Sequence, residues 1–188
     1  IDVFASHQLR AGILTALLHK QRSQKGSLVE VFLVEAGLAA QVNQSSYALN
    51  QNVNPFPLGS AHPNICPYGD LVECKEGDYL LFAVGTNAQY LRLAKTLDDQ
   101  RLWADTFLTN PQRVIHRTTL IKILQDICRP YSALSLHNKL TAANIPCAQV
   151  GGILDAFNQQ PQMAHETIID NTSFLIGKTT CFHFDSNP

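Results

Sequence analysis

The sequence predicts an α/β protein that carries an α+β segment. Helical and strand-like patterns alternate near the start of the chain, and a strand–turn–strand pattern followed by several helical patterns comes after them. Alternation of helices and strands is typical of α/β folds, whereas a hairpin followed by helices is typical of α+β units. Both architectures are therefore expected within one chain.

The composition is that of a globular protein. Of the 188 residues, 45% are hydrophobic and 15% charged, which suffices for one or two units with buried cores. The net charge of −1 provides no basic field, so we expect neither nucleic acid nor a membrane surface as a partner. No run approaches the roughly 18 apolar residues that a membrane-spanning helix needs.

The cysteines and histidines predict no metal site. Five cysteines are widely spaced, odd in number and without a CxxC pair, which argues against a zinc site and a disulfide framework. The histidines show no HExxH or other paired ligand spacing. Reduced thiols fit the cytoplasm or the mitochondrial matrix. The start of the chain has no signal-peptide pattern, and Ile1 in place of Met implies residues upstream.

The first fifty residues predict a helix, a strand and a second helix. Residues 3–22 place apolar side chains at helical spacing, with Asp2 as the expected cap and Gly26 as the expected stop. Residues 28–34 are β-branched and apolar, as in a buried strand. Residues 35–49 predict a helix whose small side chains pack closely against another backbone.

The middle of the chain predicts a connecting loop and then a hairpin. Residues 51–68 contain four prolines and several asparagines, which favour an extended or turning crossover. Residues 70–85 predict two strands joined by a turn at 75–78, in which Gly77 supplies a positive φ.

Helical spacing returns in the second half. It predicts helices over 87–97 and 110–128, and a third that Ser132 caps and that ends near Ala143. Residues 144–150 predict a short extended piece, and residues 153–160 a short helix halted by Pro161. The tail gives no legible element.

Several ordered segments together resemble the class III CoA-transferase family, the CaiB/BaiF group. The segments are Asp2 ten residues before Gly12, GILTALLHKQRSQKGSLVEVFLVEAGLAA, GSAHPNICPYG, KEGDYLLFAVGTNAQYLRL, TNPQRVIHRTTLIKIL and NIPCAQVGGILDAFNQQPQ. The resemblance implies a large domain of Rossmann-like topology, an inserted small α+β domain with an antiparallel sheet, and an interlocked homodimer. It assigns 1–50 to the large domain, 51–70 to a crossover linker, 71–158 to the small domain and 159–188 to a return segment.

The resemblance also implies an activity. Asp2 stands where the family's catalytic aspartate attacks acyl-CoA, so the expected reaction moves CoA between carboxylic acids through a mixed anhydride and an aspartyl-CoA thioester. Coenzyme A enters as the acyl-CoA substrate, and most of its contacts are expected upstream of Ile1. From the residues alone, a simple helix cap is the preferred interpretation of Asp2, and the resemblance reverses that preference.

The segment at 59–69 looks like the family loop beside the catalytic carboxylate. The resemblance implies that His62, Pro63, Asn64 and Tyr68 line the substrate site, although a rigid connector rich in proline is the alternative.

Two other functions stay open. Acyl-CoA racemases of the same superfamily carry a Glu where this chain has Asn87, which cannot transfer protons, so Asn87 is assigned to the lining and transferase is preferred. The second is a non-catalytic module that binds acyl-CoA or mediates dimerisation.

Overall fold

The computed structural model describes residues 1–181, which divide into two compact units. Unit 1 comprises Ile1–Phe56 together with the described residues from Met163 onward, and unit 2 comprises Pro57–Gln162. Both helices and strands are present, and the strands are antiparallel, in agreement with the mixed class expected from the sequence.

Unit 2 contains a three-stranded antiparallel sheet in the order β1-β2-β3. Its strands are β1 (Tyr68–Glu73), β2 (Tyr79–Ala83) and β3 (Cys147–Gln149). Val72, Leu80 and Phe82 are completely buried, so one face of the sheet supplies the core. The predicted hairpin is confirmed, and its turn contains a short 3-10 helix, η1 (Lys75–Gly77), in which Gly77 has φ 81°.

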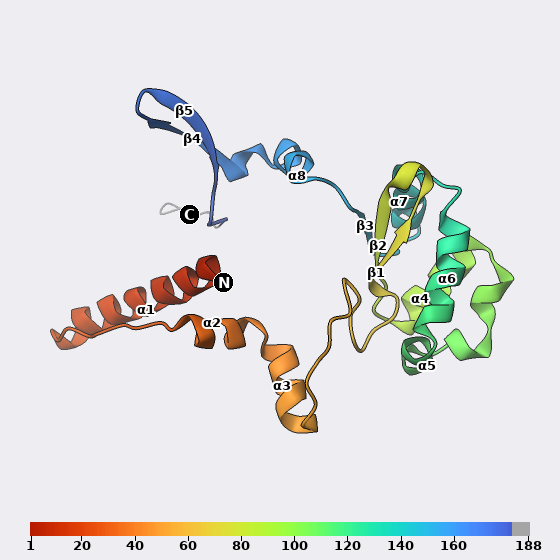
Figure 1. Ribbon diagram of the computed structural model, residues 1–188, viewed down its shortest axis with the longest axis horizontal. Helices are drawn as coiled ribbons and strands as arrows, with labels where there is room; N and C mark the ends of the chain where they lie inside the picture. Colours follow the sequence, from red (N-terminus) through yellow and green to blue (C-terminus); the bar gives the residue numbers. More distant parts are fainter. Residues whose placement is uncertain (182–188) are drawn as a thin grey trace. The chain divides into compact units, whose positions relative to one another are not determined.

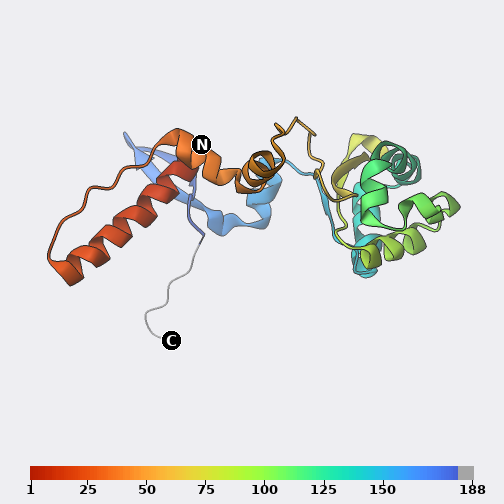
Figure 2. The same ribbon diagram turned by 90° about the horizontal axis from the view of Figure 1, so that it is seen from below.

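Helices of residues 87–142 cover that face of the sheet, and in Figure 1 and Figure 2 they gather on one side of it. Leucines from three of them, with Tyr90, complete the core. The remaining elements of unit 2 are α4 (Asn87–Leu97), η2 (Gln100–Trp103), η3 (Asp105–Phe107), α5 (Asn110–Ile115), α6 (Arg117–Cys128), α7 (Ala133–Ala142) and α8 (Ile153–Gln159), and η4 (Pro161–Met163) follows at the boundary.

Local capping explains why α4 and α7 begin where the sequence predicts. Thr86 and Gln89 form a reciprocal capping box at the start of α4. The Ser132 hydroxyl accepts the Ser135 N–H at the start of α7, which confirms the predicted cap.

The single helix predicted over 110–128 is wrong, because His116 separates α5 from α6. His116 has φ −99° and ψ 21°; its N–H donates to Gln112 O, and its carbonyl accepts from Leu120 N–H. One residue thus closes the first helix and opens the second. The apolar spacing passes through this break almost unchanged, so periodicity alone did not reveal it.

Unit 1 contains three helices and a hairpin among its described residues. They are α1 (Asp2–Ser23), α2 (Leu33–Ala40), α3 (Val42–Gln51), β4 (Ala164–Ile169) and β5 (Thr172–Gly177). Figure 2 shows α1 and the segment that returns from its end toward α2. Gly12 permits this return, because a Cβ there would lie 2.6 Å from Val29 Cγ1.

The ends of α1 correct two predictions. Asp2 is not the cap, since it lies in the first helical turn after Ile1, whose side chain cannot accept a hydrogen bond. The helix ends at Ser23, and Gln24, not Gly26, takes the left-handed conformation with φ 57° that terminates it.

The strand predicted over 28–34 is also wrong. Within residues 1–181 no strand pairs with this segment, Leu28 is 84% exposed, and α2 already begins at Leu33. Apolar β-branched composition favours a strand, but a strand forms only where a neighbour supplies ladder hydrogen bonds.

The helix predicted over 35–49 is divided at Gln41, which has φ −102° and ψ 23°. The close packing expected from its small residues is seen at Gly37, where a Cβ would lie 2.9 Å from Ile1 Cδ1. Ala36 beside it is 3% exposed. The contact is made with a side chain at the start of α1 and not with another backbone.

The hairpin β4–β5 was not anticipated. Asp170 and Asn171 connect the strands with φ 50° and 62°, while Ile169 pairs with Thr172. Two consecutive positive φ values define a type I′ turn, which Asp and Asn tolerate. In residues 1–181, no helix combines the length and apolar character that crossing a membrane requires.

Candidate active site

The candidate nucleophile, Asp2, is an exposed side chain in the first turn of α1. Within residues 1–181, no hydrogen bond or ion pair engages its carboxylate. The first N–H groups of a helix have no partner within the helix and carry partial positive charge. Asp2 is therefore an accessible carboxylate at the positive end of the α1 dipole.

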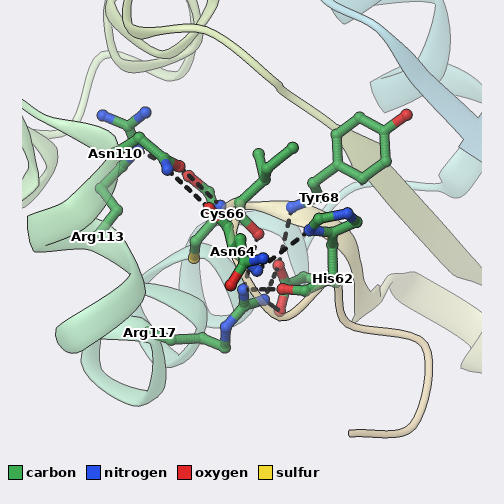
Figure 3. Close-up of polar contacts among 9 residues, drawn as sticks. His62, Asn64, Cys66, Tyr68, Asn110, Arg113 and Arg117 are labelled. Carbon is green, nitrogen blue, oxygen red and sulfur yellow. Dashed lines mark hydrogen bonds and ion pairs between the residues drawn. The ribbon is translucent and has the colours of Figure 1, made fainter. Parts of the chain in front are cut away.

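The other five predicted site residues lie in unit 2, and His62 is the most constrained of them. Its backbone N–H donates to Tyr68 O over 2.8 Å, and its Nδ1 accepts the Asn64 N–H over 3.1 Å. The His62 and Tyr68 rings meet edge to face with centroids 5.6 Å apart. Figure 3 shows the side chains of His62, Asn64 and Tyr68 in one loop. Pro63 lies between His62 and Asn64 in the sequence.

Arg117, the first residue of α6, ties this loop together. Its Nη1 donates to both Asp70 carboxylate oxygens over 2.6 Å. Its Nη2 donates to the carbonyls of His62, over 2.5 Å, and Ile65, over 2.7 Å. Asp70 also accepts the Tyr68 N–H over 2.9 Å. One guanidinium–carboxylate pair thus holds both ends of the segment from His62 to Tyr68.

Arg113 is completely buried and fixes the neighbouring backbone. Its Nε donates to Cys66 O over 2.7 Å, its Nη1 to Phe107 O over 2.9 Å and its Nη2 to Asn87 Oδ1 over 3.0 Å. The guanidinium carbon lies 4.4 Å from the centre of the Tyr90 ring. Burial lowers the pKa of Arg113 and raises the pKa of Tyr90.

Asn110 links Asn87 to the loop. The Asn110 N–H donates to Asn87 Oδ1 over 3.0 Å, and its Nδ2 donates to Asn64 O over 2.8 Å. Its own Oδ1 accepts the Cys66 N–H over 3.1 Å. Asn87 is exposed, yet its side-chain oxygen is already committed to two donors.

Arg113, Arg117 and Asp70 were not predicted from the sequence as residues that hold this loop. A usable signal was present, because Arg113 and Arg117 share helical spacing with Leu120 and Leu124, which are core residues. A charged side chain on the apolar face of a helix has to find buried partners.

The thiol beside this loop is not a candidate nucleophile. Burial, reinforced by Asp70, raises the pKa of Cys66 to about 12. The thiolate is the nucleophilic form, so Cys66 is unreactive at neutral pH. In the part of the chain that the structure describes, no group of three or more His, Cys, Asp or Glu side chains could hold a metal ion.

Unit 1 also has an open, mainly apolar groove of about 460 Å³ between α1 and the segment that follows it. The lining comprises Leu9, Ile13, Ala16, Leu17, Lys20 and residues 26–29. Asp2 is not part of this lining.

This fold and these segments define a known class of protein. The model of CoA-transferase family III matches residues 1–183, and the chain therefore belongs to that family. Among solved structures, a CAIB/BAIF family protein from Brucella suis has a TM-score of 0.73 at 24% identity, covering 97% of this chain and 48% of that one. Rv3272 from M. tuberculosis has a TM-score of 0.80 at 16% identity, covering 96% and 48%.

The curated relatives are named as transferases. A succinate–glutarate CoA-transferase of Agrobacterium fabrum is 28% identical, over 90% of this chain and 42% of its own length. An acyl-CoA transferase of Fusarium pseudograminearum is 27% identical, over 90% and 37%. The chain thus spans about two fifths of the length of these relatives.

Proposed function

We propose that this chain is part of an acyl-CoA:carboxylate CoA-transferase in which Asp2 is the nucleophile. The observation that carries the proposal is the family match over residues 1–183, which includes the aspartate at the start of α1. The names of the curated relatives support it, and dicarboxylic acids with their CoA thioesters are the substrates to test first.

The proposed reaction has two exchange steps on the carboxylate. An Asp2 oxygen attacks the thioester carbonyl carbon, the carbon–sulfur bond breaks, and CoA leaves as a thiolate. The thiolate then attacks the aspartyl carbonyl of the resulting anhydride, which releases the first acid and leaves an aspartyl-CoA thioester. The acceptor carboxylate then attacks the carbonyl of the aspartyl-CoA thioester and displaces the CoA thiolate, which gives a second anhydride. The thiolate attacks the acceptor's acyl carbonyl in this anhydride, so that a new acyl-CoA departs and the Asp2 carboxylate is regenerated.

The proposed substrate-lining residues are those that the family resemblance implies: His62, Pro63, Asn64, Tyr68 and Asn87. The racemase alternative requires an acid–base group at Asn87. The Asn87 oxygen instead accepts from Arg113 and from the Asn110 N–H, and an amide side chain is neither an acid nor a base at neutral pH. These contacts support transfer over racemisation.

An interlocked homodimer is the proposed assembly. The large apolar side chains left exposed on α1, among them Leu14, Leu17 and Leu18, support it, because such surfaces are normally covered. The cytoplasm or mitochondrial matrix is the proposed location, and the absence of a disulfide among the described cysteines is compatible with it.

The test is to trap the covalent intermediate in the full-length protein. Incubation with succinyl-CoA followed by hydroxylamine should convert Asp2 to a hydroxamate that peptide mass spectrometry locates. The Asp2→Asn protein should lose at least about 10³-fold in CoA exchange between two acids and form no hydroxamate.

Glu35→Gln is the matched control, since Glu35 is also an exposed carboxylate in the first turn of a helix. It should leave exchange unchanged. Normal exchange by the Asp2→Asn protein would refute the proposed nucleophile. Binding of acyl-CoA by the wild type without exchange or hydroxamate would favour the non-catalytic module.

A further inference from the structure

Within unit 2, α6 runs alongside β1 in the same direction, and hydrogen bonds join the two elements at successive levels. Near their starts, the guanidinium–carboxylate pair described above joins them. Further along, the Gln125 side chain donates to Glu73 O over 2.7 Å and accepts the Glu73 N–H over 2.8 Å. Just beyond both elements, the Lys75 N–H donates to Tyr131 O over 2.8 Å. The end of β1 therefore lies against the last turn of α6.

Two buried thiols, Cys74 and Cys128, fall within this contact. Cys74 stands between the two joined residues on the β1 side, and Cys128 stands midway between the two on the α6 side. Cys74 is extended, with φ −96° and ψ −177°, so it continues the alternation of β1 and shares a face with Val72. Helical spacing places Cys128 on the same face as Leu124. All four side chains belong to one core, so the two thiols are neighbours across the contact.

The protonation of the thiols agrees with this proximity. Burial, reinforced by the neighbouring Cys74 sulfur, raises the pKa of Cys128 to about 12. Burial also raises the pKa of Cys74. Cys66 is buried as well, but the neighbouring group that reinforces its raised pKa is the Asp70 carboxylate. Cys66 therefore provides a buried thiol for comparison in a different environment.

The two thiols differ in how an oxidant can reach them. Cys74 borders the turn at 75–78, whose residues are all exposed, and its N–H donates to Asp78 O over 2.7 Å across the base of that turn. Cys128 is completely buried among the side chains of the core. An exposed turn opens locally at a lower free energy than a packed core does. An oxidant therefore meets Cys74 first.

From this arrangement we propose that Cys74 and Cys128 are an oxidisable pair, which peroxide entering through the turn converts to a disulfide joining β1 to α6. The Cys74 sulfur attacks one peroxide oxygen, the oxygen–oxygen bond breaks, and the leaving hydroxide takes up the thiol proton as water, which gives a sulfenic acid. The Cys128 sulfur then attacks the Cys74 sulfur, the sulfur–oxygen bond breaks, and a second water leaves with the Cys128 proton. The two thiols thus supply the two electrons that reduce the peroxide. This chemistry does not depend on the proposed transferase reaction.

The experiment treats the full-length protein with hydrogen peroxide, alkylates the remaining thiols after unfolding, and maps the peptides without reduction. We expect a peptide that links Cys74 to Cys128 and that dithiothreitol separates. Hydrogen exchange of unit 2 peptides should slow by at least about 10-fold in the oxidised protein, because the disulfide closes a long loop in the unfolded chain. Cys74→Ala and Cys128→Ala should each abolish the linked peptide and the slower exchange.

Two controls separate adjacency and access from general unfolding. Cys66 is the internal control, because it is completely buried and its pKa is also raised to about 12, and it should stay open to alkylation. Gly77→Ala tests the route through the turn, since Gly77 has φ 81°, which alanine adopts only with strain. The strained turn should open more often and speed disulfide formation by about 5-fold.

The absence of the linked peptide after peroxide treatment would overturn the proposal, and so would pairing of Cys74 or Cys128 with a different cysteine. Oxidation of Cys66 at the same rate would also overturn it, because the reaction would then follow general unfolding. An unchanged rate in Gly77→Ala would overturn the entry of peroxide through the turn.

Discussion

Unit 2 and unit 1 differ in where their apolar side chains lie. In unit 2, Leu80, Phe82 and Leu93 are completely buried, whereas in unit 1 Leu28 is 84% exposed and Leu175 80% exposed. Burial of apolar surface is the main stabilising contribution in a folded protein. Unit 2 is thus stabilised by its own residues, whereas the described part of unit 1 derives little from such burial.

The two units also differ in how they hold their candidate site residues. The loop from His62 to Tyr68 is fixed by buried or half-buried side chains of unit 2, and no buried side-chain nitrogen or oxygen in residues 1–181 lacks a partner. Among residues 1–181, Asp2 in unit 1 is held by its helix alone. Unit 2 therefore fixes its own candidate residues with its own side chains, and the following experiments can sharpen or break this difference between the units.

The largest expected effect follows from Arg113→Met in the full-length protein. The substitution leaves the carbonyls of Cys66 and Phe107 buried without their donor. We expect a loss of about 3 to 5 kcal/mol in the free energy of unfolding of unit 2. Hydrogen exchange of unit 2 peptides measures it. Arg92→Met is the control, because Arg92 is exposed, and it should lower the free energy of unfolding by less than about 0.5 kcal/mol. A similarly small loss in Arg113→Met would contradict the structural role of Arg113.

A smaller loss is expected from truncation of the core. Leu124 is completely buried, so Leu124→Ala should cost about 3 kcal/mol through lost burial and a cavity. The same change at Leu175, which is 80% exposed, should cost less than about 0.5 kcal/mol. Hydrogen exchange of peptides from each unit gives both values. Equal costs at the two sites would break the contrast in burial, and would indicate that an assembly covers Leu175.

The third prediction concerns alkaline pH. Burial raises the pKa of Cys66 and of Cys128 from 9.0 to about 12. The unfolded chain therefore loses these protons at a lower pH than the folded unit does. The resulting stability is fully present below pH 9 and is lost as pH rises from about 9 to 12.

Urea unfolding of unit 2 against pH measures this decline. Cys128→Ala should make the decline shallower, because one of the two shifted thiols is gone. Cys181→Ala should not change it, since Cys181 is exposed. A stability that stays constant from pH 9 to pH 12 would show that these thiols are not shielded as the structure indicates.

The same contrast explains how much of the fold the sequence could predict. In unit 2, α4, α7 and the β1–β2 hairpin were predicted because apolar spacing, Ser132 and Gly77 agree with the contacts that these elements make. In unit 1, the expected strand at 28–34 failed because its apolar residues find no strand partner among residues 1–181. A local pattern predicts an element well where the chain itself supplies the neighbours.

The candidate site was predictable only in part, for a similar reason. His62, Asn64 and Tyr68 were assigned because the segment at 59–69 resembles a family loop, whose residues are contiguous in the sequence. Arg113 and Arg117 act through contacts that span 26 to 55 positions with the loop, Asp70 and Asn87, and no local pattern encodes such pairings. The sequence signal for the two arginines is their helical spacing with the core residues Leu120 and Leu124.

The smallest expected effect tests the hairpin of unit 1. Asn171 has φ 62° in the turn between β4 and β5, a conformation that glycine adopts without strain. Asn171→Gly should therefore stabilise the hairpin by about 0.5 kcal/mol, and Asn171→Ala should destabilise it by about 1 kcal/mol. Hydrogen exchange of residues 164–177 measures both changes. If the stability of the hairpin is unchanged in both variants, contacts outside the turn stabilise it. Unit 1 would then resemble unit 2 more closely than its exposed side chains indicate.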